Sequence, residues 1–168
     1  MSATAPAQIR RFRPGDRTQV LALAPRLTEG AVPWRDPAAM RRAAQNWVQT
    51  SIDSVGQHGH AVYVAIACDQ VVGVISIREQ THFTGQTDAY IGELAVASGM
   101  ERRGIATALL NAAEGWAAQR GMKFLTLHTQ AANQPARNLY RQLGYHEEEL
   151  QLTKAIQARH QGQSHTFE

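Results

Sequence analysis

Hydrophobic and polar residues alternate along several short runs of the chain, and this period of two is typical of β-strands. The runs lie at residues 8–13, 60–68, 71–80, 88–98 and 122–130, and residues 145–156 carry the pattern of one or two more. The two runs on either side of Asp69 and Gln70 predict an antiparallel hairpin, because a two-residue polar turn can join them. The sequence therefore predicts a sheet of six to seven strands.

Between these runs, apolar residues recur at the spacing of one helix face. The segments span about residues 16–27, 36–55, 103–120 and 133–143, which predicts four helices. Asp16, Asp36 and Asn133 stand where polar side chains cap helix N-termini. Gly121 and Gly144 stand where left-handed residues end helices. Three of the four helices thus begin at a predicted side-chain cap.

The order of these elements predicts a mixed α+β sheet. A strand, a helix and a strand at residues 88–130 imply a parallel pair joined by a right-handed crossover, while the other strands pair as antiparallel neighbours. Strict alternation along residues 88–98 would put Tyr90, Gly92, Leu94 and Val96 on one face and Ile91, Glu93, Ala95 and Ala97 on the other. A chain of 168 residues suits one domain, which we expect at residues 1–157, followed by a polar tail at residues 158–168.

Composition places the chain among ordinary water-soluble globular proteins, with 43% hydrophobic and 18% charged residues. The net charge of +3 is compatible with an anionic small-molecule ligand, which needs fewer cationic side chains than nucleic acid does. A solvated basic surface explains the charge equally. We expect neither a nucleic-acid nor a membrane partner, and a cytoplasmic location, because no run of eighteen apolar residues occurs. The scattered histidines predict no metal site. Cys68, the single cysteine, ends an apolar run and is predicted to be buried.

The third predicted helix begins without an obvious cap, in the stretch MERRGIATALL at residues 100–110. A helix start presents unpaired N–H groups and a partial positive charge, which suit phosphate oxygens. Arg102 and Arg103 add cations, and Gly104 lets the main chain approach a ligand closely. The P-loop and the dinucleotide fingerprint are both absent. From these residues alone, a surface loop whose arginines face water explains the stretch as well as a phosphate site does.

Two blocks together carry a family resemblance. The block ELAVASGMERRGIATALLNAAE, followed by NQPARNLYRQLGY, resembles the GNAT superfamily of N-acetyltransferases over roughly residues 90–145. The resemblance implies acetyl-CoA as co-substrate, strands four and five splayed apart, and no metal, and it is compatible with a homodimer. Glu101 stands where the family motif usually has Gln or Arg, so that Arg102 or Arg103 would have to supply the missing phosphate contact.

The resemblance also implies how the chain would hold acetyl-CoA. The main chain of Leu94, Ala95 and Val96 would pair with the pantetheine arm as an added strand would, and Asn133 would contact the same arm. The pyrophosphate would be held by the N–H groups of Arg102, Arg103, Gly104, Ile105, Ala106 and Thr107.

Two side chains are candidates for the proton transfers. Tyr140 would donate a proton to the leaving thiolate, although its position also suits packing on the helix stripe. Glu93 would accept a proton from the amine, by way of water, although a strand glutamate can equally pair with a nearby cation. The expected acceptor is a primary amine of a small molecule rather than a protein N-terminus. A non-catalytic acyl-CoA-binding or regulatory module is the alternative.

Overall fold

The strands of the sheet lie side by side in the order in which the chain makes them. In the computed structural model, which describes residues 7–156, the order is β1-β2-β3-β4-β5. The strands are β1 (Gln8–Arg11), β2 (His60–Ala67), β3 (Gln70–Thr81), β4 (Thr87–Val96) and β5 (Leu125–Leu127). All neighbours are antiparallel except β4 and β5, which are parallel. The predicted mixed sheet with a parallel pair of strands four and five is confirmed.

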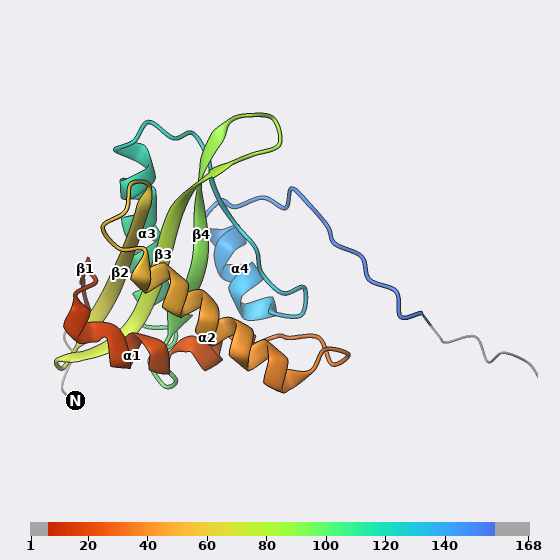
Figure 1. Ribbon diagram of the computed structural model, residues 1–168, viewed down its shortest axis with the longest axis horizontal. Helices are drawn as coiled ribbons and strands as arrows, with labels where there is room; N and C mark the ends of the chain where they lie inside the picture. Colours follow the sequence, from red (N-terminus) through yellow and green to blue (C-terminus); the bar gives the residue numbers. More distant parts are fainter. Residues whose placement is uncertain (1–6, 157–168) are drawn as a thin grey trace, which may run out of the picture.

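Helices cover both faces of this sheet (Figure 1). They are α1 (Arg17–Ala22), α2 (Pro37–Asp53), α3 (Ile105–Ala118) and α4 (Gln134–Gln142), with two short 3-10 helices, η1 (Pro14–Asp16) and η2 (Ala24–Thr28). The first predicted helix is therefore divided into α1 and η2. Pro25 explains the division, because proline has no N–H to continue the α-helical hydrogen bonds and disfavours the α conformation at the residue before it.

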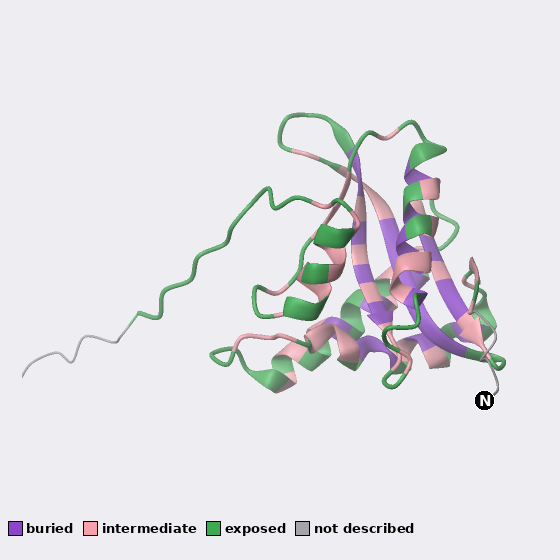
Figure 2. Cartoon of the chain, turned by 180° about the vertical axis from the view of Figure 1, so that it is seen from behind, coloured by how far each residue is buried: buried purple, intermediate pink, exposed green. Residues whose placement is uncertain are grey.

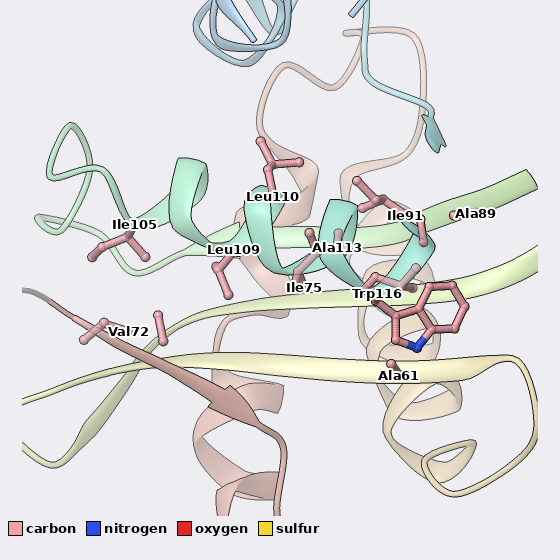
Figure 3. Packing of buried hydrophobic residues seen from close by; sticks show 13 residues of the cluster. Ala61, Val72, Ile75, Ala89, Ile91, Ile105, Leu109, Leu110, Ala113 and Trp116 are labelled. Atoms are coloured by element: carbon pink, nitrogen blue, oxygen red, sulfur yellow. The ribbon is translucent and has the colours of Figure 1, made fainter. Parts of the chain in front are cut away.

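The two faces of the sheet carry separate hydrophobic clusters. One joins α1, η2 and α2 to the sheet, with Val20, Val48 and Val74 among its buried residues. The other joins α3 to the opposite face, and Figure 3 shows Leu109, Leu110 and Trp116 of α3 over the strands. The central strands are the most buried part of the chain (Figure 2). Burial on both faces holds the middle of the sheet in place.

The β2–β3 hairpin is confirmed, but Cys68 is not buried. Cys68 and Asp69 form the two-residue turn with φ angles of 48° and 60°, and the thiol is exposed. Two successive residues of positive φ give a turn whose twist matches the flanking strands. The apolar run thus ends at Ala67, one residue before the cysteine.

Residues 145–156 form no strand, so the expected sixth and seventh strands are absent from residues 7–156. This segment runs away from the sheet (Figure 1), and Leu150, Leu152 and Ile156 are exposed. Its apolar alternation suits a strand, but a strand also requires a neighbouring strand to pair with. The polar tail predicted at residues 158–168 lies outside the described residues.

Most of the predicted helix ends are confirmed. Asp36 accepts hydrogen bonds from the N–H groups of Ala38 and Ala39, and the Asn133 side chain accepts one from Ala136. Gly121 and Gly144 have φ angles of 68° and 87° at the ends of α3 and α4.

Asp16 does not cap α1 with its side chain. Its carboxylate accepts hydrogen bonds from the Arg10 guanidinium at 2.7 and 2.8 Å and from the Arg13 N–H at 2.7 Å. The carboxylate therefore ties β1 to η1.

No helix in the part of the chain that the structure describes has the length and apolar character needed to cross a membrane. No three His, Cys, Asp or Glu side chains within residues 7–156 are grouped so as to hold a metal ion.

We predict that Asp16→Asn lowers the free energy of unfolding at pH 7 by about 2 kcal/mol, because Arg10 loses a charged partner. The hydrogen bonds from Arg10 hold the pKa of Asp16 below its usual value. A carboxyl group whose pKa is lower in the folded state stabilises the fold above the unfolded pKa, about 4, and loses this effect as the pH falls through the folded pKa. Urea unfolding curves of the two proteins should therefore converge at acid pH.

Asp53→Asn is the matched control. Asp53 also pairs with an arginine, Arg17, at 2.7 Å, but its side chain is 53% exposed, and exposed pairs contribute little. An equal loss of stability in both variants would contradict the role of Asp16.

Candidate functional site

A β-bulge lies halfway along β4. Ile75 is opposite Leu94 and Ile77 is opposite Ile91, so that Ser76 alone faces two residues, Gly92 and Glu93. The Glu93 N–H donates to Ser76 Oγ at 3.0 Å. A side-chain hydroxyl on β3 therefore satisfies an N–H that the bulge removes from the regular ladder.

After the bulge, odd- and even-numbered residues of β4 exchange the faces of the sheet on which they lie. Ala89 and Ile91 belong to the α3-side cluster before the bulge, whereas Leu94 and Val96 pack against that cluster after it. The predicted strict alternation along residues 88–98 is therefore wrong, because the bulge inserts one extra residue.

Gly92 and Glu93 share the α2 face of the sheet. A Cβ atom at Gly92 would lie 2.7 Å from Ser76 Oγ, and Glu93 is bonded to Ser51 of α2. Glycine at the bulge thus leaves room for the serine hydroxyl.

The pairing between β4 and β5 ends directly before the bulge. They pair only from Ala89–Leu125 to Ile91–Leu127. The Ala97 N–H donates to the Val72 carbonyl at 2.8 Å, and an antiparallel ladder alternates in direction from one residue to the next. It follows that Ala95 turns its main-chain groups to β3, whereas Leu94 and Val96 turn theirs toward the gap on the β5 side.

The N-terminus of α3 lies beyond the end of β4 and, among the described residues, carries no side-chain cap. The first helical hydrogen bond runs from the Ala108 N–H to the Gly104 carbonyl at 2.9 Å, so the N–H groups of Ile105, Ala106 and Thr107 have no partner within the helix. Gly104 has a φ of 77°, and a Cβ there would meet nothing within 4 Å. Arg102, Arg103 and Gly104 in front of these N–H groups are exposed.

Arg26 of η2 fastens the loop in front of α3. Its Nε donates to the Val96 carbonyl at 2.9 Å, and its guanidinium forms salt bridges with Glu101 and Glu29. Main-chain hydrogen bonds, its own N–H first, and the Arg26 guanidinium lower the pKa of Glu101. The carboxylate in the motif position is thus held by an arginine that lies 75 residues away in sequence.

The loop between η2 and α2 packs against the start of α4. A Cβ at Gly30, where φ is 73°, would lie 2.7 Å from the main-chain nitrogen of Asn133. Only glycine allows this close approach without strain. The loop and α4 therefore meet beside the gap between β4 and β5.

Glu93 is 6% exposed. One oxygen of its carboxylate accepts hydrogen bonds from two serine hydroxyls. Ser51 Oγ donates to Glu93 Oε2 at 2.7 Å, and Ser76 Oγ donates to the same oxygen. Both serines also line a pocket of about 180 Å³ between α2 and the sheet. The polar residues of its lining are Thr50, Ser51, Ser54, His60, Ser76 and Arg78.

Tyr140 lies on the other face of the sheet. It packs against the α3-side cluster, and its ring is 5.6 Å from that of Tyr145. Burial raises the pKa of Tyr140 to about 12, so the phenol keeps its proton near neutral pH. The two candidate catalytic side chains therefore flank β4 from opposite faces, Glu93 from the α2 face and Tyr140 from the α3 face.

The profile of the acetyltransferase (GNAT) family matches residues 25–145 of the chain. The chain belongs to this family. Its fold, with parallel β4 and β5 that separate beyond Ile91, is GNAT-like, in agreement with the expectation from the sequence.

Individual relatives agree with this assignment. A dTDP-fucosamine acetyltransferase of Escherichia coli is 31% identical over 112 residues, which cover 67% of this chain and 45% of the relative. The chain thus spans less than half the length of that GNAT relative.

Solved structures share the fold. A Pyrococcus furiosus protein assigned as an acetyl transferase has a TM-score of 0.72 at 24% identity, and the match covers 89% of this chain and 99% of that one. AAC(6')-Iy in complex with the bisubstrate analogue CoA-S-monomethyl-acetylneamine has a TM-score of 0.65 at 16% identity, covering 92% and 100%. An aminoglycoside acetyltransferase, HMB0005, from an uncultured soil metagenomic sample has a TM-score of 0.62 at 25% identity, covering 94% and 100%.

Sequence reasoning missed several residues of this GNAT site. Arg26 gave no signal, because the two partners that connect it to the site, the Val96 carbonyl and Glu101, lie 70 and 75 residues away. Ser76 did give one, since it is the single hydroxyl in the buried run from Val71 to Ile77 and a buried hydroxyl requires a partner.

A row of three side chains, Arg78, Tyr90 and His128, was also missed. The Arg78 guanidinium lies 4.3 Å from the centre of the Tyr90 ring, and the Tyr90 hydroxyl is 3.0 Å from His128 Nδ1. We call these three residues the arginine row.

We predict that Gly92→Ala lowers the free energy of unfolding by about 1–3 kcal/mol, because the new methyl group would overlap Ser76 Oγ and separate it from Glu93. Urea unfolding measures the effect. Gly115→Ala is the control, since a Cβ at this helical position of α3 meets nothing within 4 Å. Alanine there should leave the stability unchanged or raise it by about 0.5–1 kcal/mol. Equal stability of the Gly92 variant and the wild type would show that the bulge tolerates a side chain.

Proposed function

We propose that this chain is an acetyl-CoA-dependent N-acetyltransferase that moves the acetyl group by direct attack of a primary amine of a small molecule. The uncapped N-terminus of α3, next to the gap between β4 and β5, is the observation that carries the proposal. α2 and α4 are closed by Asp36 and Asn133, whereas α3 begins at a bare glycine with two arginines before it. Free N–H groups, a helix dipole and cations together suit a pyrophosphate.

The gap beside β4 suits the pantetheine arm of acetyl-CoA. Leu94 and Val96 would pair with the arm, while Ala95 keeps the segment attached to β3. The Val96 carbonyl already accepts from Arg26, which leaves the Val96 N–H and both Leu94 groups for the arm. The Asn133 side-chain oxygen caps α4, so its amide NH₂ would make the contact with the ligand.

The two faces of β4 would supply the two proton transfers. The amine nitrogen attacks the thioester carbon, the carbon–sulfur bond breaks, and the thiolate takes the proton of Tyr140. The amine loses its proton to Glu93 through water, because the carboxylate is buried behind two serine hydroxyls. Because burial raises the pKa of Tyr140 to about 12, its hydroxyl carries its proton at the start of the reaction.

A small-molecule acceptor is supported by the relatives. The Escherichia coli relative is named for an amino sugar nucleotide, and several structural neighbours are aminoglycoside acetyltransferases. Both names refer to amines of small molecules, and the pocket on the α2 face, next to Glu93, would receive such an acceptor.

Acetyl-CoA should raise the melting temperature, because a ligand that binds only the folded state stabilises it. Replacing Arg102 and Arg103 together by alanine should weaken acetyl-CoA binding about tenfold, since charge-assisted contacts to the phosphates are lost. Calorimetry measures the affinity. Arg41 and Arg42, an exposed arginine pair on α2, provide the control, and their double alanine variant should bind normally. A wild type without any melting shift would contradict the proposed function.

Tyr140→Phe should lower kcat about 100-fold or more while acetyl-CoA affinity is kept, because only the proton donor is removed. Thiol release in the presence of an amine panel measures the rate. The control is Tyr145→Phe, since the Tyr145 hydroxyl is buried without a hydrogen-bond partner among the described residues, and this variant should keep its kcat.

Glu93→Gln should lower kcat in the thiol-release assay while acetyl-CoA affinity is kept, because the amide cannot accept the proton of the amine. Ser51→Ala, which leaves Glu93 its bond to Ser76, is the control and should lose less of the rate. An unchanged kcat in Glu93→Gln would exclude Glu93 as the base.

A further inference from the structure

Arg78 is a half-buried arginine of the α2 face and has no ionic partner among the residues that the structure describes. Its guanidinium donates to Gln80 Oε1 at 3.1 Å and stacks on Tyr90, but it forms no salt bridge within residues 7–156. A guanidinium has five N–H donors, so most of them remain available. Stacking on the ring holds the guanidinium in place, and less conformational entropy is lost when it binds a ligand.

The arginine row lies beside the reacting end of the site. Arg78 is paired in register with Tyr90, and Tyr90 is paired with Thr126 of β5. An Arg78 nitrogen lies 3.3 Å from the position that a Cβ of Gly92 would take, and Gly92 precedes Glu93. An acceptor whose amine is close to Glu93 therefore has its next few atoms within reach of Arg78.

The pocket beside Arg78 is rich in hydroxyl groups and contains no acidic residue in its lining. Glu93 lies behind Ser51 and Ser76, and both hydroxyls donate to it, which disperses its negative charge. The volume of about 180 Å³ is smaller than a site for a whole drug-sized ligand. The pocket thus fits one polar portion of an acceptor, with a cation at its rim.

We propose that Arg78 determines acceptor specificity by binding an anionic group, a carboxylate or a phosphate, carried by the acceptor close to the reacting amine. This inference rests on the proposed function of the same site. The planar guanidinium matches either anion with two parallel hydrogen bonds. The Ser51, Ser76 and Ser54 hydroxyls already donate, to Glu93 and to the Thr50 carbonyl. The Thr50 hydroxyl, which lines the same pocket, would supply a further donor to the anion or to the groups next to it.

A polycationic acceptor does not fit this surface. It would bring several ammonium groups next to Arg78, and the pocket lining offers no carboxylate to pair with them. Buried or half-buried charges of one sign repel strongly at this range. The site therefore differs in charge from one suited to an aminoglycoside.

Matched pairs of amines test the proposal, with acetyl-CoA present at saturation. Glucosamine 6-phosphate against glucosamine tests a phosphate, and glycine against glycinamide tests a carboxylate. The wild type should show a kcat/KM at least about tenfold higher for the anionic member of one pair. Arg78→Gln should lower kcat/KM for that member by about 10- to 100-fold, mainly through KM, and leave the neutral member unchanged. Arg78→Lys should retain part of the preference, because it keeps the charge and loses the two-point geometry.

Arg120→Gln is the matched control. Arg120 also stacks on an aromatic ring, that of Trp116, at 4.1 Å, but on the α3 side of the sheet, and its loss should leave the preference intact. Equal rates for both members of both pairs, or an equal loss for both members in Arg78→Gln, would overturn the proposal and leave the proposed function standing. A wild type that acetylates no amine in the panel, neutral or anionic, would contradict the proposed function itself, and this inference with it.

Discussion

The arrangement of this molecule depends on one hydrogen bond, from the Glu93 N–H to Ser76 Oγ. The bulge it stabilises places one extra residue in β4, and three consequences follow. The pairing of β4 with β5 ends at Ile91, directly before the bulge. Leu94 and Val96 turn to the α3 face, opposite to what their spacing predicts. Glu93 turns to the α2 face, where the same serine and Ser51 hold its carboxylate. A single hydroxyl therefore couples the path of the strand to the position of the candidate base.

The second determinant of the site is the missing side-chain cap at the N-terminus of α3, among the described residues. α2 and α4 each begin at a side chain that satisfies their free N–H groups, Asp36 and Asn133. α3 begins at Gly104, which can offer no such group, and the loop before it is fixed from outside by Arg26. The arginine pairs with both Glu101 and Glu29, and so holds the Glu101 carboxylate in place in the loop before this helix start. The departure from the family motif at residue 101 is thus accompanied by a partner in η2.

Local chemistry predicted much of the fold, whereas contacts between distant residues escaped prediction. Asp36 with Pro37, Asn133, Gly121 and Gly144 act within one turn of their own helices, so their meaning can be read from neighbouring residues. The bulge at Gly92 could not be predicted, because the pattern of residues 88–98 continues as a regular strand would. Arg26 and the arginine row depend on contacts between residues that are 12 to 75 positions apart in sequence. Residues 145–156 were predicted to form a strand and do not form one. Their apolar alternation is a local pattern, whereas a strand also needs a distant sheet edge to pair with.

α4 is the least buried of the longer helices, and this has a consequence for how readily it unfolds locally. None of its residues is fully buried, and Figure 2 shows only exposed and intermediate positions along it. Segments with little buried apolar surface open locally at a small free-energy cost, and their amide hydrogens exchange with water sooner than those of the core. The helix that begins after Asn133 and carries Tyr140 therefore opens at a smaller free-energy cost than the central strands. A ligand that contacted α4 would spend part of its binding free energy on ordering this helix, so that amide exchange in α4 would report on binding more sensitively than exchange in β3 or β4.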